Sequence, residues 1–312
     1  MPSHRYDFIA IDLDGTLLCP RGRVSETNAR AIHRARHAGV KVSVCTGRGY
    51  NECKHVTSQI DQVEPVVVAG GAILSHARTG RTLHRFPMNP ALVRRLVGTL
   101  TSHGHAALVL KDPAADEDPS QSRHGASGYP SPGHDYLIVS PKGEKAIDPI
   151  TMWWFREHKI KFHVVPTLDD DEHPGHTVRV GVCGTRGRTL AAADELQRDF
   201  AGEVVFHHFG AVVPGDHQKR PEDQIVILEA FDRSVNKWSA IRWLADRDGI
   251  DHARIAAIGN DINDVAMLSA AGLGVAMENA IPEAKAAARM HTRANDADGV
   301  AHAIEMILAG EW

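Results

Sequence analysis

Short apolar runs alternate with helical stretches at both ends of the chain, and this alternation constrains the fold more than any other feature. Before residue 84 the expected strands cover 7–13, 40–45 and 66–69, and the first two are separated by a helix over 25–37. After residue 222 the expected strands cover 225–228, 255–258 and 273–276, again with helices between them. Because strand–helix–strand units place their strands parallel, the two ends predict one doubly wound, Rossmann-like α/β core.

The middle of the chain has a different order of predicted strands and helices. Residues 84–222 contain short strand-like runs mixed with two helical stretches, one of them opened by Asn89-Pro90. Residues 112–134 are rich in Pro, Gly, Ser, Asp and His, which is typical of a long loop. The pattern predicts a discontinuous core over 1–83 and 223–312, interrupted by an inserted α+β domain over 84–222.

Charge and composition exclude several classes of partner. With 312 residues, 35 Lys and Arg against 39 Asp and Glu, and a net charge of −4, the chain has no basic excess for nucleic acid or an anionic membrane. Its longest apolar stretch, 66–74, is too short to span a bilayer, and the N-terminus has no apolar leader. The four cysteines show no CxxC spacing, so we expect reduced thiols in a cytoplasmic protein.

Histidine is unusually frequent, with 20 residues. The pairs His103/His105 and His207/His208 offer transition-metal ligands, but no HExxH or histidine–carboxylate motif accompanies them. Solvated surface imidazoles are the favoured interpretation.

Polar residues follow several core strands where each strand ends. The first strand is followed by Asp12-Leu-Asp14-Gly-Thr16, the second by Thr46-Gly-Arg48, and the strand at 255–258 by the segment 259–264, Gly-Asn-Asp-Ile-Asn-Asp. Lys237 lies near the start of a helix. Because ligands bind beyond the carboxyl ends of strands in open α/β sheets, we expect these groups to converge on one edge.

This set of side chains suits phosphoryl transfer. Clustered carboxylates repel one another unless a cation lies among them, and all-oxygen ligands suit Mg²⁺. One carboxylate can attack phosphorus, and a second can act as general acid and base. A lysine and a hydroxyl can hold the phosphoryl oxygens, and Gly15 and Gly47 let the backbone approach the anion. Each motif alone is weak, because DxD turns and surface lysines are common; their order and their positions after apolar strands carry the prediction.

These motifs resemble the haloacid dehalogenase (HAD) superfamily of phosphatases, in the Cof-like branch (subfamily IIB), which has a large cap of the C2 type. The matching segments are Asp12-Leu-Asp-Gly-Thr16, Thr46-Gly-Arg48, Asn236-Lys237 and the segment 259–264 followed by Val-Ala-Met-Leu. Later segments around Gly272–Asn279 and Ala294–Ala301 also look familiar. The resemblance covers about residues 6–83 and 222–310, and the middle matches a cap only in length and element order.

The resemblance implies a role for each matching residue. Asp12 would be the nucleophile, and Asp14 the general acid and base. Thr46 and Lys237 would be catalytic through their grip on the phosphoryl group. The substrate-binding set would be Thr46, Gly47, Arg48, Lys237 and Asn263, and the Mg²⁺ ligands would come from Asp12, Asp14 (main-chain carbonyl), Asn260, Asp261 and Asp264.

Two positions depart from the family pattern. Asn260 stands where the commoner motif has a metal-binding aspartate, so we expect weaker Mg²⁺ binding, with Asp261 or Asp264 compensating. Gly70-Gly71 stands where relatives often have Asn-Gly, and we expect this to affect only a turn.

The resemblance thus implies a Mg²⁺-dependent phosphatase of a small phosphorylated metabolite, a sugar phosphate or similar, acting through an aspartyl-phosphate. A phosphomutase-type transfer and a non-catalytic phosphometabolite sensor, which Asn260 would suit, are the alternatives. No motif in residues 84–222 names the substrate.

Overall fold

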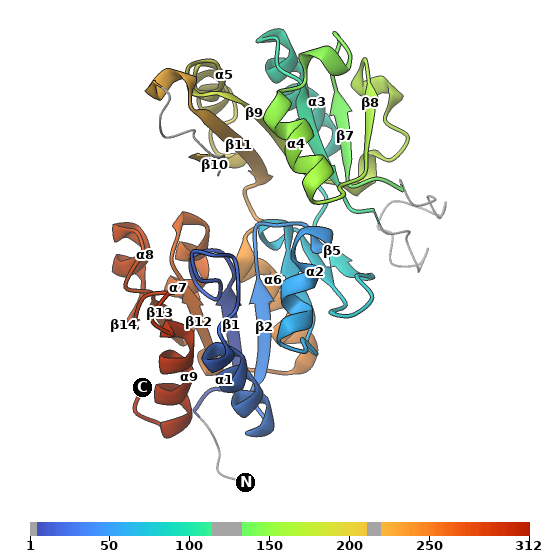
Figure 1. Cartoon of the computed structure of the whole chain (residues 1–312). Helices are drawn as coiled ribbons and strands as arrows, with labels where there is room; N and C mark the ends of the chain where they lie inside the picture. The colour runs from blue at the N-terminus through green and yellow to red at the C-terminus, as the bar shows by residue number, and fades with distance from the viewer. Residues whose placement is uncertain (1–4, 114–132, 211–219) are drawn as a thin grey trace. The chain divides into compact units, whose positions relative to one another are not determined.

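The computed structural model describes residues 5–113, 133–210 and 220–312, and it divides into two compact units (Figure 1). The first comprises Met1–His84 and Ser234–Trp312, and the second Arg85–Arg233. The strand β11 (Ile225–Asp232) pairs with strands of the second unit, so the expectation that 225–228 belongs to the core sheet is wrong. An apolar strand of either sheet has the same local pattern, and only its pairing partners decide its place.

The first unit contains an eight-stranded sheet. In spatial order its strands are β14 (Met290–His291), β13 (Leu273–Ala276), β12 (Ile255–Gly259), β1 (Phe8–Asp12), β2 (Lys41–Cys45), β3 (Val66–Val68), β4 (Ile73–Ser75) and β5 (Thr82–Arg85). All pairs from β14 to β3 are parallel, and β4 runs antiparallel to β3. The chain winds outward from β1 through β2 and from β12 through β13, so the strand order reverses between β1 and β12. Such a switch point is where open α/β sheets bind ligands.

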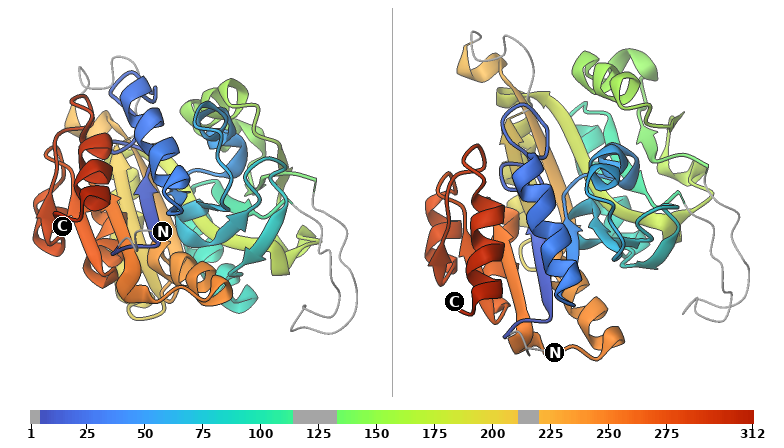
Figure 2. Two further views of the ribbon diagram at one scale, coloured as in Figure 1. Left: turned by 90° about the horizontal axis from the view of Figure 1, so that it is seen from below. Right: turned by 60° about the horizontal axis from the view of Figure 1, so that its bottom comes forward.

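Helices cover both faces of this sheet, which confirms the predicted doubly wound α/β fold. They are α1 (Glu26–His37), α2 (Tyr50–Gln59), α6 (Lys237–Asp248), α7 (Val265–Ala270), α8 (Pro282–Ala287) and α9 (Gly299–Ala309). Helices α1 and α9, from opposite ends of the sequence, lie side by side (Figures 1 and 2). The expected start of α1 is confirmed, because the Ser25 hydroxyl accepts a hydrogen bond from the Asn28 N–H at 3.1 Å.

The second unit is α+β, as predicted. Its sheet has the order β10 (Val204–Gly210), β11, β9 (Thr177–Thr185), β6 (Ala107–Lys111), β7 (Tyr136–Val139) and β8 (Phe162–Val165). All pairs are antiparallel except β7 with β8. Helices α3 (Pro90–Ser102) and α5 (Arg186–Asp199) pack on β9 and on each other around an apolar core.

A third helix of this unit, α4 (Pro149–Glu157), was not expected from the sequence. Its three consecutive aromatic residues over 153–155, Trp-Trp-Phe, are of types that are enriched in β-strands. The available signals lay at its start, where the Asp148 side chain accepts from the Ile150 N–H at 2.9 Å and Pro149 opens the first turn.

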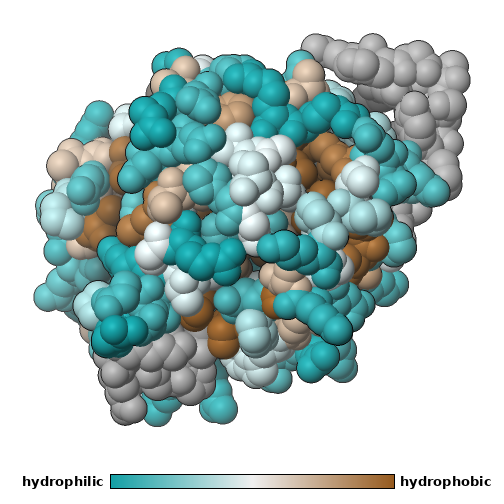
Figure 3. Space-filling view, turned by 90° about the horizontal axis from the view of Figure 1, so that it is seen from above, coloured by the Kyte–Doolittle hydropathy of each residue, from teal (hydrophilic) through white to brown (hydrophobic). Residues whose placement is uncertain are grey.

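Figure 3 shows the hydropathy of one face of the molecule. On the face in Figure 3, hydrophobic side chains lie in small groups among hydrophilic ones. Of the described residues, no helix is both long and apolar enough to cross a membrane. No disulfide joins any of the four cysteines in this structure. Most of the loop expected over 112–134 lies outside the described residues.

Candidate active site

Asp12 is the last residue of β1, at the switch point between β1 and β12. Its side chain is 6% exposed, and its Oδ1 lies 2.6 Å from the Nζ of Lys237. The chain turns sharply just after it, because Gly15 has a φ of +74°, a conformation that glycine adopts without strain. The turn brings the N–H of Leu17 back to the carbonyl of Asp12 at 3.2 Å.

Lys237 is the first residue of α6 and is completely buried. Its ammonium lies 2.6 Å from both Asp12 Oδ1 and Asp264 Oδ1, and 3.4 Å from Asn263 Oδ1. The structure therefore joins two motifs that lie 225 residues apart in the chain.

The start of α6 is held by a close backbone approach. The Asn236 side chain accepts from the Ser239 N–H at 3.0 Å and caps the helix. Gly71 has a φ of +107°, and a Cβ there would lie 2.1 Å from the Asn236 carbonyl oxygen. The expectation that Gly70-Gly71 affects only a turn is therefore too narrow, because Gly71 lets the residue before Lys237 reach its place.

Burial dominates the electrostatics of Asp12. Burial and the Asp264 carboxylate raise the pKa of Asp12 to about 7, against the effect of Lys237. Burial lowers the pKa of Lys237, but the charges of Asp12 and Asp264 outweigh it and leave that pKa above its ordinary value. Lys237 is therefore charged at neutral pH, and a further cation beside Asp12 would favour the ionised carboxylate.

The acidic side chains of the loop after β12 accept hydrogen bonds from main-chain N–H groups of the same loop. Asp264 Oδ2 accepts from the main-chain N–H groups of Asn260 and Asp261, at 2.8 and 3.0 Å. Asp261 is exposed, and its Oδ1 accepts from the Ile262 N–H at 2.7 Å. Asp264 holds Lys237 and this loop, and Asp261 caps the loop, so the expectation that either compensates for Asn260 as a metal ligand finds no support in these contacts.

The side chain of Asn260 lies against three oxygen atoms instead. Turned with its amide nitrogen inward, it is 3.0 Å from Asp12 Oδ2, 2.8 Å from the main-chain carbonyl of Asp14 and 2.9 Å from Thr16 Oγ1. A carboxylate, a main-chain carbonyl and an amide oxygen are the hard donors that Mg²⁺ takes, so these residues fit that cation.

The histidines that the sequence analysis paired have other neighbours in the described part of the chain. Among the described residues, no three His, Cys, Asp or Glu side chains gather as metal ligands. His103 lies 2.7 Å from the Glu195 carboxylate, and His105 lies 3.3 Å from the Arg188 carbonyl oxygen.

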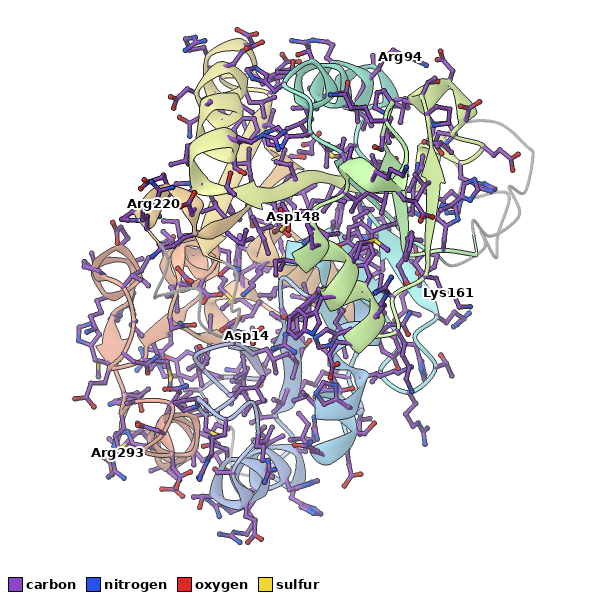
Figure 4. The ribbon with its side chains drawn as sticks, turned by 45° about the horizontal axis from the view of Figure 1, so that its top comes forward. Asp14, Arg94, Asp148, Lys161, Arg220 and Arg293 are labelled. Atoms are coloured by element: carbon purple, nitrogen blue, oxygen red, sulfur yellow. The ribbon has the colours of Figure 1, made fainter. Side chains whose placement is uncertain are left out.

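Asp14 lies in the loop after β1 and is labelled in Figure 4. It is 54% exposed, and Arg48 grips it with two hydrogen bonds, from Nε at 2.8 Å and from Nη2 at 2.5 Å. Burial lowers the pKa of Arg48, but the hydrogen bonds and charge of Asp14 outweigh it and raise that pKa overall. A bidentate pair of this kind fixes orientation as well as charge.

The remaining predicted residues lie after β2 and in the loop after β12. Thr46 directly follows β2 and is buried, and its N–H donates to the Val67 carbonyl at 2.8 Å. A Cβ on Gly47 would lie 3.7 Å from Asn263 Nδ2, so Gly47 and Asn263 are neighbours. Strand ends and Asn263 thus meet at one edge, as the sequence predicts.

Two supporting asparagines have no role assigned by the sequence. Asn279 donates from Nδ2 to the Gly15 carbonyl at 2.8 Å, and Asn295 donates to the Leu18 carbonyl at 2.7 Å. Both hold the loop that carries Asp12 and Asp14. Their only sequence signal is their place in the two familiar segments after β13 and β14.

Comparisons with known proteins agree with this geometry. The family model for haloacid dehalogenase-like hydrolases matches residues 9–304. The 5-amino-6-(5-phospho-D-ribitylamino)uracil phosphatase YwtE of Bacillus subtilis is 30% identical over 97% of this chain and 99% of its own. The pyridoxal phosphate phosphatase YbhA of Escherichia coli is 25% identical over 95% and 96%.

Solved structures agree on the fold. A haloacid dehalogenase-like hydrolase from Bacteroides thetaiotaomicron is 21% identical, with a TM-score of 0.71 over 97% of this chain and 99% of its own. This chain therefore belongs to the haloacid dehalogenase-like hydrolase family.

Proposed function

We propose that this protein is a Mg²⁺-dependent phosphatase that hydrolyses a small phosphorylated metabolite through an aspartyl-phosphate. The observation that carries the proposal is the position of Asp12: buried at the switch point, paired with Lys237 on one oxygen, and beside Asn260 on the other. A carboxylate held in this way is oriented by its neighbours and can serve as a nucleophile.

Asp12 and Asp14 carry out different parts of the proposed reaction, nucleophilic attack and proton transfer. A carboxylate oxygen of Asp12 forms a bond to phosphorus, the ester P–O bond breaks, and Asp14 gives its proton to the leaving oxygen. Asp14 then takes a proton from water, which attacks the phosphorus and releases inorganic phosphate and the Asp12 carboxylate. Asp14 is exposed enough for such exchange, whereas Asp12 is shielded from it.

Positive and polar groups hold the phosphoryl oxygens. Lys237, Thr46, Gly47 and Asn263 lie around Asp12 for this purpose. Asp12, the carbonyl of Asp14 and Asn260 would hold Mg²⁺, which supplies charge neutralisation when bound.

We propose that the second unit is the cap and selects the substrate. The two named relatives act on monophosphates of small metabolites, and both of those metabolites carry a nitrogen heterocycle. Sugar phosphates and heterocycle-bearing phosphates are therefore the substrate classes we favour. We also propose a cytoplasmic location, because the cysteines of the sequence show no CxxC spacing and no disulfide framework.

A metabolite panel tests the proposal. We expect Mg²⁺-dependent phosphate release from some member of a set containing sugar phosphates, pyridoxal phosphate and 5-amino-6-(5-phospho-D-ribitylamino)uracil, and loss of release with EDTA. An isomerised phosphate without free phosphate would indicate phosphotransfer instead. Binding without turnover at saturating Mg²⁺ would indicate a sensor.

Replacing Arg48 should separate its effect on catalysis from its effect on stability. In Arg48→Met, Asp14 loses its bidentate partner and the site loses one cation, so we expect kcat/KM to fall about 10- to 100-fold, the equivalent of one charged hydrogen bond. Thermal stability should change little, because Asp14 is half exposed.

Matched variants control the Arg48 experiment. Arg48→Lys keeps the positive charge but cannot form the bidentate pair with Asp14, so its kcat/KM should lie between those of wild type and Arg48→Met. Arg30→Met removes an exposed arginine that pairs with Glu26 on α1, and should leave kcat/KM unchanged. Wild-type kcat/KM in Arg48→Met would show that the pair with Asp14 does not serve the reaction.

A further inference from the structure

The side-chain amide of Asn260 can be placed in two orientations, which present different atoms to the same neighbours. With its oxygen inward, it receives a hydrogen bond from Thr16 Oγ1 at 2.9 Å, but it also faces two acceptors, Asp12 Oδ2 and the Asp14 carbonyl. With its nitrogen inward, its two N–H groups can donate to those two acceptors, and Thr16 Oγ1 lies 2.9 Å from the nitrogen. A hydroxyl can donate or accept, so Thr16 is compatible with both orientations.

The presence or absence of a cation among these oxygens decides which orientation of the Asn260 amide is more stable. Without a cation, the oxygen-inward amide leaves buried acceptors facing one another, which is unfavourable. The nitrogen-inward amide satisfies them. With a divalent cation among the oxygens the preference reverses, because the amide then offers its carbonyl as a ligand.

The surroundings confine the change to the side chain. The Asn260 N–H is bound to Asp264 Oδ2 at 2.8 Å, and its carbonyl accepts from the Ile281 N–H at 3.0 Å. Gly15 leaves the space that the amide fills, since a Cβ there would lie 2.4 Å from Asn260 Nδ2. The backbone is therefore fixed on both sides, so a change between the two orientations involves only the side-chain amide.

We propose that Asn260 is a reversible amide that donates through its nitrogen to Asp12 and Asp14 when the site holds no cation and turns its oxygen inward when a divalent cation binds. This inference rests on the proposed function of the site. Without a cation, the amide nitrogen satisfies the oxygens of Asp12 and Asp14, so these residues keep their positions. An aspartate at this position would bind the cation more tightly but would add a carboxylate beside Asp12 and Asp264, with Lys237 their only buried ammonium partner among the described residues.

Asn260→Asp tests both halves of this proposal. After EDTA treatment and dialysis, we expect its melting temperature to fall at least about 4 °C below wild type. Calorimetric titration with Mg²⁺ should show about tenfold tighter binding than wild type, and Mg²⁺ should raise its melting temperature more. Asn89→Asp, an exposed helix cap in the second unit that keeps its capping group, adds the same charge and should change neither quantity.

A second measurement follows the amide itself. In protein labelled with ¹⁵N-asparagine, the side-chain NH₂ signals that vanish in Asn260→Asp identify Asn260. We expect these signals to shift and to lose protection from solvent exchange when Mg²⁺ is added.

The outcomes separate this inference from the proposed function. Equal Mg²⁺ affinity in wild type and Asn260→Asp, or amide signals that Mg²⁺ leaves unchanged, would overturn the reversal even if phosphate is released. The expected stability and amide shifts without any phosphate release would overturn the phosphatase and keep the reversal. A protein that binds no Mg²⁺ in either form contradicts both.

Discussion

Asp12→Asn should abolish phosphate release, with a loss of about 10⁴-fold or more in kcat, because the amide oxygen cannot form the acyl phosphate that the carboxylate forms. The substitution keeps the shape of the side chain and an oxygen that can accept from Lys237, 2.6 Å away in the wild type. Phosphate release measured with the best compound of the panel, at saturating Mg²⁺, checks the prediction.

A folded variant is essential to that interpretation. Asp12→Asn removes one of the two buried carboxylates that contact Lys237, and Asp264 still neutralises the lysine, so we expect cooperative unfolding near the wild-type midpoint. Asp7→Asn provides the matched control, since Asp7 precedes the same strand but pairs with Arg254 away from the site. It should retain full activity, and more than a tenth of wild-type activity in Asp12→Asn would contradict the nucleophile assignment.

The sequence locates the sheet edge that carries the candidate site because of a general property of parallel sheets. Asp12, Thr46 and the loop after β12 each follow an apolar strand, and the carboxyl ends of parallel strands meet at one edge. Lys237 is placed there by its position near the start of a helix and by the resemblance of Asn236-Lys237 to a family motif. These are local signals with a predictable position in space.

Other features depend on contacts between distant segments and leave no local signal. β11 looks like a core strand until its partners β9 and β10 are known. The close approach of Gly71 to Asn236 is visible only once both backbones are placed. Likewise, only the structure shows that Asp264 is committed to Lys237 and to two main-chain N–H groups, which leaves Asn260 as the side chain beside Asp12 Oδ2.

Lys237→Met should be the most destabilising substitution at the site. The ammonium is fully buried between Asp12 and Asp264, and methionine fills much of its volume without its charge. Removing one partner of a buried charge cluster costs about 3–5 kcal/mol, because the carboxylates that stay behind are desolvated and repel each other. Urea unfolding in EDTA measures this change, and phosphate release should be lost as well.

Two comparisons decide whether charge, rather than packing, is the cause. Lys41→Met removes a half-exposed lysine that pairs with Asp248 at 2.6 Å, and it should cost no more than about 1 kcal/mol. In the double variant Asp12→Asn with Lys237→Met, one of the two stranded carboxylates is gone, so unfolding should require more urea than in Lys237→Met alone. If the double variant is instead less stable than Lys237→Met, the lysine acts through packing and hydrogen bonds, and its charge is not what holds the two carboxylates together.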